Sequence, residues 1–402
     1  MGGVNVGGRG SKIRRLLLWG MLAMLGLTAV AAAVLELGLR RPDDSGQGPV
    51  LELTQIGDPP EFARALEPRD LQFPADHGPH LEFQTEWWYY IGNLRTPDGR
   101  HFGFQLTFFR RGLQPGEPGR RSGFAANHIY SAHLALTDTA GGAHRAWERY
   151  SRAAAGLAGA QSDPYRVWLD DWSVDALNST ADVIRLYARE EDFELELVLN
   201  AEMPPTRHGE AGLSQKSPKP GNASYYVSFT RMSASGRIGL GQAVYEVQGQ
   251  GWFDHEWGTT ALGPEAVGWD WFGLQLDDGR ELMVFQIRKR DGTIEPVSGG
   301  TLVDVDGAPQ RLSASQLLLR PLGTWTSPGS GAVYPSGWQL EMPERGIELT
   351  IRPQLADQEN RLSVVYWEGA IVVSGTSRGE AVSGEGYAEL TGYFLPLVEG
   401  DF

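Results

Sequence analysis

Alternation of apolar and polar residues with a period of two recurs along the chain, whereas apolar stripes with the 3.6-residue period of a helix are scarce. The clearest alternating runs are residues 102–108, 193–199, 338–342 and 347–351. Asp-Gly pairs separate such runs at 98–99, 278–279, 291–292 and 306–307. Glycine in these pairs supplies the positive φ angle of a tight hairpin turn. The pattern therefore predicts an all-β fold of antiparallel meanders, and closure into barrels would remove their exposed edges.

Two blocks of the sequence share one order of features. Residues 87–90 (WWYY) open an aromatic strand, and an Asp-Gly-Arg turn and an apolar strand follow; residues 269–272 (WDWF) open a second block of the same order. A chain of 402 residues is also too long for one compact core. We therefore predict two related barrels, at 71–262 and 263–402, that join in the Gly/Pro/Ala-rich stretch 259–268.

Net charge and cysteine content exclude several classes of function. The chain has a formal net charge of −15, and nucleic-acid binding needs clustered Lys and Arg that the body lacks. Anionic lipid headgroups would repel so acidic a body, so we expect membrane attachment only through the N-terminal segment. The absence of cysteine excludes disulfides, thiolate catalysis and cysteine-ligated zinc.

The N-terminal segment favours export. An uncharged apolar run, residues 16–35, follows the basic residues Lys12, Arg14 and Arg15. A run of about 20 residues is long enough to cross a ~30 Å hydrocarbon core, and the preceding positive charge keeps its start cytoplasmic. Small residues at 29–33 also offer A-x-A cleavage sites of a secretory signal.

Residues 1–40 are therefore interpreted as a signal anchor or as a cleaved signal peptide, with a buried helix of the soluble fold as a third alternative. Residues 41–70 form a linker, since 42–60 are rich in Pro, Gly, Asp and Ser. The body is expected on the periplasmic side of the inner membrane, anchored there or secreted to the periplasm.

The densest chemistry flanks the proposed boundary, in the sequences WFDHEW (252–257) and GWDW (268–271). In an extended strand Asp254 and Glu256 point to one side while His255 and Trp257 point to the other. A carboxyl group against tryptophan rings loses solvation and can stay protonated near neutral pH, as a general acid must. The alternative is that these carboxylates cap turns and pair with arginine where the domains meet. The candidate catalytic residues are Asp254, His255, Glu256 and Asp270.

A second cluster lies near the start of the body. His77, His80 and Glu86 can ligate a metal through imidazole and carboxylate groups, but loop histidines are more often only hydrogen-bonded, so we expect neither a metal nor another cofactor. A G-x-S-x-G pattern at 375–379 lacks the following helix and the later histidine that a nucleophile elbow requires.

Several strings, spread in order over residues 71–395, carry a family resemblance. They are Phe73 with Asp76-His77-Gly78, His80, Glu86-Trp87-Trp88-Tyr89, Gly92-Asn93-Leu94, Gly212-Leu213-Ser214-Gln215-Lys216, Ala223-Ser224-Tyr225-Tyr226, Asp254 with Glu256-Trp257, Gly268-Trp269-Asp270-Trp271, Tyr366-Trp367-Glu368-Gly369, Gly386-Tyr387 and Glu389-Leu390-Thr391-Gly392-Tyr393. Together they resemble the AttH/carotenoid 1,2-hydratase-like family.

The resemblance implies two lipocalin-like β-barrels and a hydrophobic small-molecule ligand, polyene or lipid-like. Hydratases of this family add water to an isolated C=C bond of an acyclic carotenoid, whereas other members are labelled secreted hydrolases or accompany ABC-type export permeases. In that exported branch the position of His255 is often arginine, a departure that bears on any catalytic role for His255. Residues expected to bind ligand are His77, His80, Glu86, Trp87, Trp88, Tyr89, Tyr226, Trp257, Trp269, Trp271 and Tyr387.

Hydration is the most economical reaction for such a set. A protonated carboxyl, of Asp254 or Glu256 or else Asp270, would donate a proton to the alkene, and a second carboxylate would activate water. The rings of Trp257, Trp269 and Trp271 would face the carbocation. One alternative is a carrier with the same pocket and no turnover, serving an ABC-type permease; another is a secreted serine hydrolase.

Overall fold

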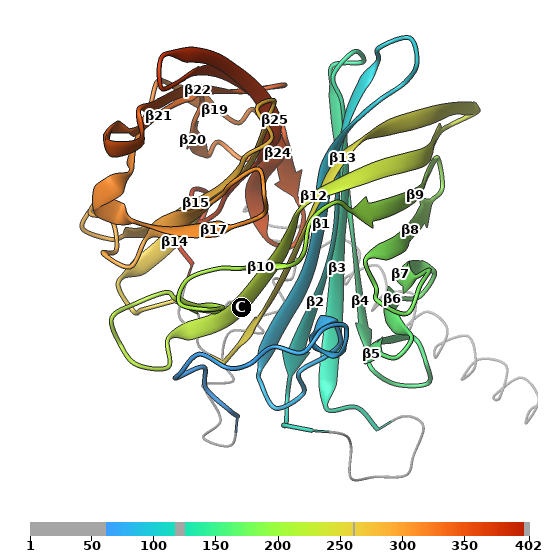
Figure 1. Ribbon diagram of the computed structural model, residues 1–402. Helices are drawn as coiled ribbons and strands as arrows, with labels where there is room; N and C mark the ends of the chain where they lie inside the picture. Colours follow the sequence, from blue (N-terminus) through green and yellow to red (C-terminus); the bar gives the residue numbers. More distant parts are fainter. Residues whose placement is uncertain (1–61, 117–124, 260–261, 398–402) are drawn as a thin grey trace, which may run out of the picture. The chain divides into compact units, whose positions relative to one another are not determined.

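A computed structural model describes residues 62–116, 125–259 and 262–397. These residues form strands, turns and three short 3₁₀ segments: η2 (Ala75–His77), η3 (Ala314–Gln316) and η4 (Pro343–Arg345). No helix among them is long and apolar enough to cross a membrane. The prediction of an all-β fold is confirmed (Figure 1). The segment predicted as a signal or anchor, and most of the linker, lie outside the described residues.

The first sheet has 13 strands in the order β4-β3-β2-β1-β13-β12-β9-β8-β7-β6-β5, with β10 and β11 paired to β12. Its end strands approach each other, since β6 contacts β3 and β4, so the sheet nearly closes into a barrel. In chain order the strands are β1 (Thr85–Arg95), β2 (His101–Gly112), β3 (His128–Asp138), β4 (Ala143–Arg152), β5 (Ala158–Ser162), β6 (Tyr165–Leu169), β7 (Trp172–Ala176), β8 (Val183–Glu190), β9 (Phe193–Ala201), β10 (Thr206–Arg207), β11 (Leu213–Gln215), β12 (Ala223–Leu240) and β13 (Ala243–Gly258).

The second sheet has 10 strands in the order β17-β16-β15-β14-β25-β24-β22-β21-β18, with β23 paired to β24, and β19 and β20 form a separate hairpin. Its strands are β14 (Ala266–Leu276), β15 (Glu281–Lys289), β16 (Gly299–Val303), β17 (Pro309–Ser313), β18 (Leu318–Pro321), β21 (Trp338–Met342), β22 (Ile347–Pro353), β23 (Glu359–Arg361), β24 (Val365–Ser377) and β25 (Glu380–Leu390); the hairpin is β19 (Thr324–Thr326) and β20 (Val333–Pro335).

The two sequence blocks that resemble each other occupy equivalent places. Strand β1 opens the first sheet and pairs with β2 on one side and with the last strand, β13, on the other. Strand β14 opens the second sheet and pairs in the same way with β15 and the last strand, β25. Each block turns at its Asp-Gly-Arg, where Gly99 and Gly279 have φ angles of +90° and +86°. The repeat in the sequence is therefore a repeat of strand connections.

The alternating runs bury one face or both, depending on their neighbours. In β9 the apolar residues Phe193 to Leu199 face the first core, and the residues between them are half-buried. In β2 the residues between the phenylalanines, such as Gly103 and Gln105, are buried as well. The second sheet packs against this side of β2: a Cβ atom on Gly103 would meet Ala370 and Tyr387 at 2.8 Å. The second sheet therefore covers the face of β2 that points away from the first core, and both faces of this strand are buried.

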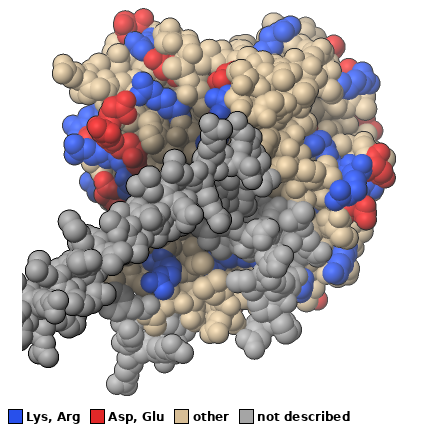
Figure 2. Space-filling view, turned by 180° about the vertical axis from the view of Figure 1, so that it is seen from behind, with Lys and Arg blue, Asp and Glu red and all other residues tan. Residues whose placement is uncertain are grey.

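One face of the molecule shows charged side chains of both signs (Figure 2). On the face seen in Figure 2, Lys and Arg side chains are scattered among Asp and Glu side chains. Pairs such as Arg145–Asp192, at 2.8 Å, are exposed to solvent and contribute about 0–1 kcal/mol each to stability. This pattern differs from the gathered positive surface that phosphate recognition requires.

His77, a predicted ligand-binding residue, lies in the interior of the first sheet. Its imidazole packs against the rings of Phe73, Tyr165, Phe229 and Phe253, and neither ring nitrogen has a hydrogen-bond partner. Burial, followed by the nearby His255, lowers its pKa to about 3. The side chain therefore stays neutral in the folded protein under physiological conditions.

Acid pH is expected to destabilise the fold in part through His77. Between pH 6.5 and pH 3 the unfolded chain binds a proton at this residue and the folded chain does not, so stability falls as pH falls. From pH 7 to pH 5 the wild type should lose about 2 kcal/mol more than His77→Leu, which cannot titrate. Urea unfolding of both proteins at the two pH values measures the difference; equal losses would contradict it.

Candidate active site between the two sheets

A cavity of about 190 Å³ lies between the two sheets and takes its lining from both. Strands β1, β2, β3 and β13 contribute one side, and strands β14, β15, β24 and β25 the other. Tyr150 and Val364, which are 37% and 40% exposed, also line it and connect it to solvent. For comparison, an engineered protein cavity of about 150 Å³ binds benzene. The cavity therefore has room for a group of about one ring.

Asp254 presents a buried carboxyl group to the cavity from β13. Its Oδ2 accepts a hydrogen bond from Tyr226 Oη at 2.7 Å, and its Oδ1 accepts from Trp252 Nε1 at 2.6 Å and from the hydroxyl of Ser228. Burial raises the pKa of Asp254 to about 7, although these three hydrogen bonds act in the opposite direction. A substantial fraction of Asp254 is thus protonated near neutral pH, which is the state a proton donor requires.

Glu256 lies two residues further along β13 and faces the same cavity. Lys216 Nζ pairs with Glu256 Oε1 at 2.6 Å, and the hydroxyl of Ser224 donates to the same oxygen. The Lys216 ammonium also lies 5.2 Å from the ring centroids of Tyr226 and Phe285. The two carboxyl groups of β13 therefore differ in environment: Asp254 has neutral hydrogen-bond partners, while Glu256 has a cation.

A second pair of carboxyl groups lines the opposite side of the cavity. Glu368 on β24 and Glu389 on β25 are direct cross-strand partners. Glu368 is completely buried and accepts a hydrogen bond from Tyr89. Burial, followed by the charge of Glu389, raises its pKa well above the ordinary value. Burial also raises the pKa of Glu389 to about 8, against a hydrogen bond from Trp269.

Aromatic side chains form much of the remaining wall. Trp87, Tyr89, Tyr226, Trp269 and Trp271 all line the cavity. Trp271 Nε1 donates to Tyr226 Oη at 3.0 Å, so the hydrogen bond that Tyr226 gives to Asp254 is itself supported from the second sheet. Rings of this kind can stabilise a positive charge through their faces.

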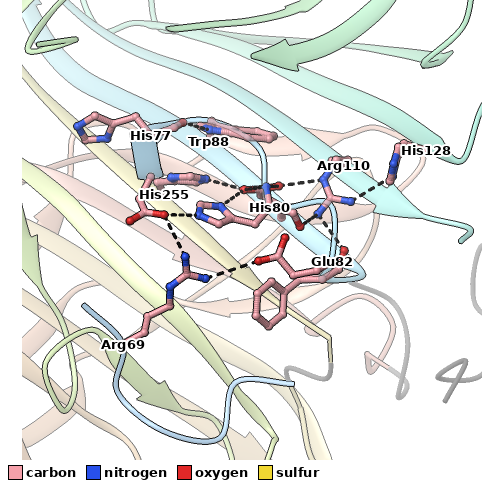
Figure 3. Close-up of polar contacts among 11 residues, drawn as sticks. Arg69, His77, His80, Glu82, Trp88, Arg110, His128 and His255 are labelled. Atoms are coloured by element: carbon pink, nitrogen blue, oxygen red, sulfur yellow. Dashed lines mark hydrogen bonds and ion pairs between the residues drawn. The ribbon is translucent and has the colours of Figure 1, made fainter. Parts of the chain in front are cut away.

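Two residues of the second predicted cluster, His80 and Glu86, form a separate polar network with His255 on the other side of β13 (Figure 3). Glu86 lies at its centre, completely buried, and receives Arg110 Nε at 2.9 Å, His80 Nδ1 at 2.8 Å and His255 Nε2 at 2.9 Å. Burial opposes a charge on Glu86, but Arg110 and the two imidazoles outweigh it and hold the pKa of this carboxyl well below its usual range. His80 also contacts Asp76 at 3.0 Å.

Among the described residues, one group of side chains has metal-ligand spacing: ligand atoms of His80, Glu86 and His255 lie within 4.8 Å of one another. Metal binding requires neutral imidazoles. Burial lowers the pKa of His80, but its hydrogen bonds with Asp76 and Glu86 outweigh burial and raise it. Arg110 already provides a cation at Glu86. We therefore interpret the group as a structural ion-pair network.

The structure divides the residues predicted from the sequence between several places. Asp254, Glu256, Trp87, Tyr89, Tyr226, Trp269 and Trp271 line the cavity. Glu86, His80 and His255 form the separate network, and Trp257 stacks on His80 with ring centroids 3.8 Å apart. Trp88 donates to the carbonyl of His77 in the first core, and Tyr387 packs between the sheets beside the cavity. Asp270 faces away from the cavity and pairs with Arg288 at 3.0 Å.

Several cavity residues were not among the candidates: Lys216, Tyr366, Glu368, Glu389 and His133. Tyr366 Oη receives a hydrogen bond from Gln105 and contacts His133 Nδ1 at 2.8 Å, so it joins the two sheets. Tyr366, Glu368 and Glu389 all lie in strings that carry the family resemblance. Their position in these strings was the one indication of a functional role in the sequence. It did not distinguish them from residues of the same strings that have a structural role.

Two β-sheets of equivalent strand order, the first nearly closed, with an acid- and aromatic-lined cavity between them, define a tandem lipocalin-like protein. The AttH-like family profile matches residues 64–393, and the chain belongs to the AttH-like family. This confirms the lipocalin-like fold and the family resemblance found in the sequence. No curated protein matches the sequence.

Solved structures give the same result. A crystal structure of an AttH-type protein from Nitrosomonas europaea is 37% identical, covers 83% of this chain and 100% of its own, and superposes with a TM-score of 0.74. Kievitone hydratase from Nectria haematococca is 14% identical over 82% of this chain and 98% of its own, with a TM-score of 0.62. CghA is 12% identical over 84% and 96%, with a TM-score of 0.51. The last two likenesses establish the fold alone.

Proposed function

We propose that this protein binds a small hydrophobic molecule, or the end of a larger one, in the cavity between its sheets and adds water to a C=C bond. One observation carries the proposal: a buried carboxyl group, Asp254, has its pKa raised to about 7 inside an aromatic-walled cavity. Apolar pockets at domain interfaces with a few convergent polar groups are the usual form of a ligand site. A hydratase among the neighbours of the same fold supports the choice of reaction.

In this proposal Asp254, Glu256 and the cavity tryptophans each have a separate role in hydration. Protonated Asp254 donates its proton to one alkene carbon, and the other carbon becomes a carbocation facing Trp87, Trp269 and Trp271. Water attacks the carbocation, and Glu256 accepts a proton from the attacking water. The product is a tertiary alcohol. Proton transfer through solvent then returns Asp254 and Glu256 to their starting states.

The charge arrangement suits this sequence of steps. Asp254 has only neutral donors as partners, so it can hold a proton. Glu256 pairs with Lys216 and is the proton acceptor for the attacking water. Among the described residues of the cavity, the hydroxyl of Ser131 has no hydrogen bond to a base that would make it a nucleophile, so the serine-hydrolase alternative has no support there.

Incubation with α-methylstyrene in water enriched in ¹⁸O tests the proposal. This alkene is about one ring in size and gives a tertiary benzylic cation when protonated. The expected product is 2-phenylpropan-2-ol that carries one ¹⁸O atom, detected by mass spectrometry and absent with heat-denatured protein. If α-methylstyrene binds but is recovered unchanged, the carrier alternative replaces the hydratase.

We also propose that the body lies outside the cytoplasm, because basic residues precede the apolar run 16–35. A reporter that is active only outside the cytoplasm, fused at Phe402, should then be active. Activity of a cytoplasm-only reporter at the same position would contradict this.

A further inference from the structure

The Glu368–Glu389 pair forms a part of the cavity that the hydration steps do not use. The two residues face each other across β24 and β25, on the opposite side of the cavity from Asp254 and Glu256. Glu368 is completely buried, and its Oε2 atom has no hydrogen-bond partner. Glu389 is half-buried and lines the same cavity. Native proteins leave few buried polar atoms unpartnered, so this one needs an explanation.

The pair cannot carry two negative charges. Neither glutamate has an ion-pair partner in the parts of the chain that the structure describes; their neighbours are the Tyr89 hydroxyl and the Trp269 indole. Two adjacent carboxylates without a cation would repel each other in a medium of low polarity, so at least one keeps its proton. At neutral pH this end of the cavity therefore offers an O–H donor.

We infer that the ligand carries an uncharged oxygen atom, a carbonyl or a hydroxyl, that accepts a hydrogen bond from the Glu368–Glu389 pair. The inference rests on the proposed function, since it assigns the chemistry of a ligand to the same cavity. It places the oxygen of the ligand on the β24–β25 side and its reacting carbon on the β13 side. A pure hydrocarbon would leave the donor of the pair without an acceptor, which costs binding free energy.

A cationic ligand is the main competitor, because carboxylates and aromatic rings together also recognise ammonium groups. In this cavity an ammonium group of the chain itself already lies beside aromatic rings and a carboxyl group. The Lys216 ammonium lies beside the Tyr226 and Phe285 rings and pairs with Glu256. A second cation in a cavity of about 190 Å³ would meet Lys216 at close range. An anion would meet four carboxyl groups. The neutral oxygen is the remaining match.

Three probes of nearly equal shape test the inference by calorimetric titration: acetophenone with a carbonyl oxygen, α-methylstyrene with a methylene in its place, and 1-phenylethylamine with an ammonium. Acetophenone should bind about fivefold more tightly than α-methylstyrene, since one net hydrogen bond distinguishes them. Equal binding of these two, or tighter binding of 1-phenylethylamine, would overturn the inference and leave the cavity as the ligand site. Failure of all three to bind would overturn the proposed site and the inference with it.

Variants and a measurement on the wild type locate the donor. The double variant Glu368→Gln/Glu389→Gln keeps uncharged donors and should keep the preference for acetophenone. The double variant Glu368→Leu/Glu389→Leu removes both carboxyl groups and should reduce the ratio to about one; Glu380→Gln, on the exposed part of β25, is the matched control. Should Glu368→Leu/Glu389→Leu not fold, the infrared carbonyl stretch of acetophenone bound to wild type decides. A stretch below its value in hexane supports the hydrogen bond, and an unshifted stretch overturns it. Neither readout depends on turnover, so a failure of hydration is recognised separately.

Discussion

Replacing Asp254 by asparagine is expected to lower the rate of hydration by two to four orders of magnitude, the usual contribution of a positioned acid or base. Asparagine keeps the shape of the side chain and removes its acidity. Ligand affinity should change little, because the aromatic wall and the Glu368–Glu389 side of the cavity are untouched. Turnover and affinity, measured on the same preparation, separate these two effects.

The pH dependence of turnover also tests the role of Asp254 as a general acid. A general acid must be protonated, so wild-type turnover should fall as pH rises through about 7, the pKa to which burial raises Asp254. Any residual activity of Asp254→Asn should lack this decline. Asp192→Asn, which removes an exposed carboxylate in the β8–β9 turn, is the control and should behave as wild type. Unchanged turnover in Asp254→Asn would remove Asp254 from the mechanism.

Replacing Arg110 by methionine is expected to lower the free energy of unfolding by about 3–5 kcal/mol, the usual result of removing one partner from a buried ion pair. Arg110 is completely buried. It pairs with Glu86 and also donates to the carbonyl oxygens of His80 and Phe83, at 2.9 and 3.0 Å. The variant leaves a buried carboxylate without its guanidinium partner and removes one donor from each of the two carbonyl oxygens.

A double variant shows whether Arg110→Met destabilises the protein by leaving the Glu86 charge uncompensated or only by loss of packing. Adding Glu86→Gln to Arg110→Met removes the uncompensated charge, so the double variant should be less destabilised than the sum of the single ones. Arg320→Met is the matched control; Arg320 is exposed and its pair with Glu341 should contribute at most about 1 kcal/mol. Urea unfolding gives all the values. Strict additivity would show that charge compensation is not the role of Arg110.

The sequence predicted the faces of four residues in β13, residues 254–257, because side-chain direction in a strand depends on spacing. Asp254 and Glu256 line the cavity, and His255 and Trp257 lie on the opposite side. The all-β fold followed from the same period of two and from the Asp-Gly turns. These properties are local, and a sequence displays them directly.

Properties that depend on pairing between strands distant in the chain could not be predicted from the sequence. Glu368 and Glu389 meet only because β24 and β25 pair in one register. Gly103 and Gln105 occupy the polar positions of an alternating run, which suggests solvent, yet the second sheet covers them. The same limit explains why the pairing of Lys216 with Glu256 was missed: the two residues are 40 positions apart along the chain, and only the fold brings them together.

The interior of the first sheet offers the main alternative place for a ligand, since a barrel can enclose one small molecule. In this protein that interior is occupied by its own side chains, among them Trp88, Phe104 and Leu197, each completely buried. The cavity between the sheets is lined instead by Asp254, Glu256 and tryptophans. Ligand location is therefore the point on which the account depends.

A crystal structure of the protein soaked with 4-bromoacetophenone measures that location directly, because bromine is identified by its anomalous signal. The account predicts the ring between Trp269 and Trp271 and the Asp254 side of the cavity, with the carbonyl oxygen toward Glu389. Bromine inside the first sheet beside His77, with the cavity between the sheets left empty, would contradict it.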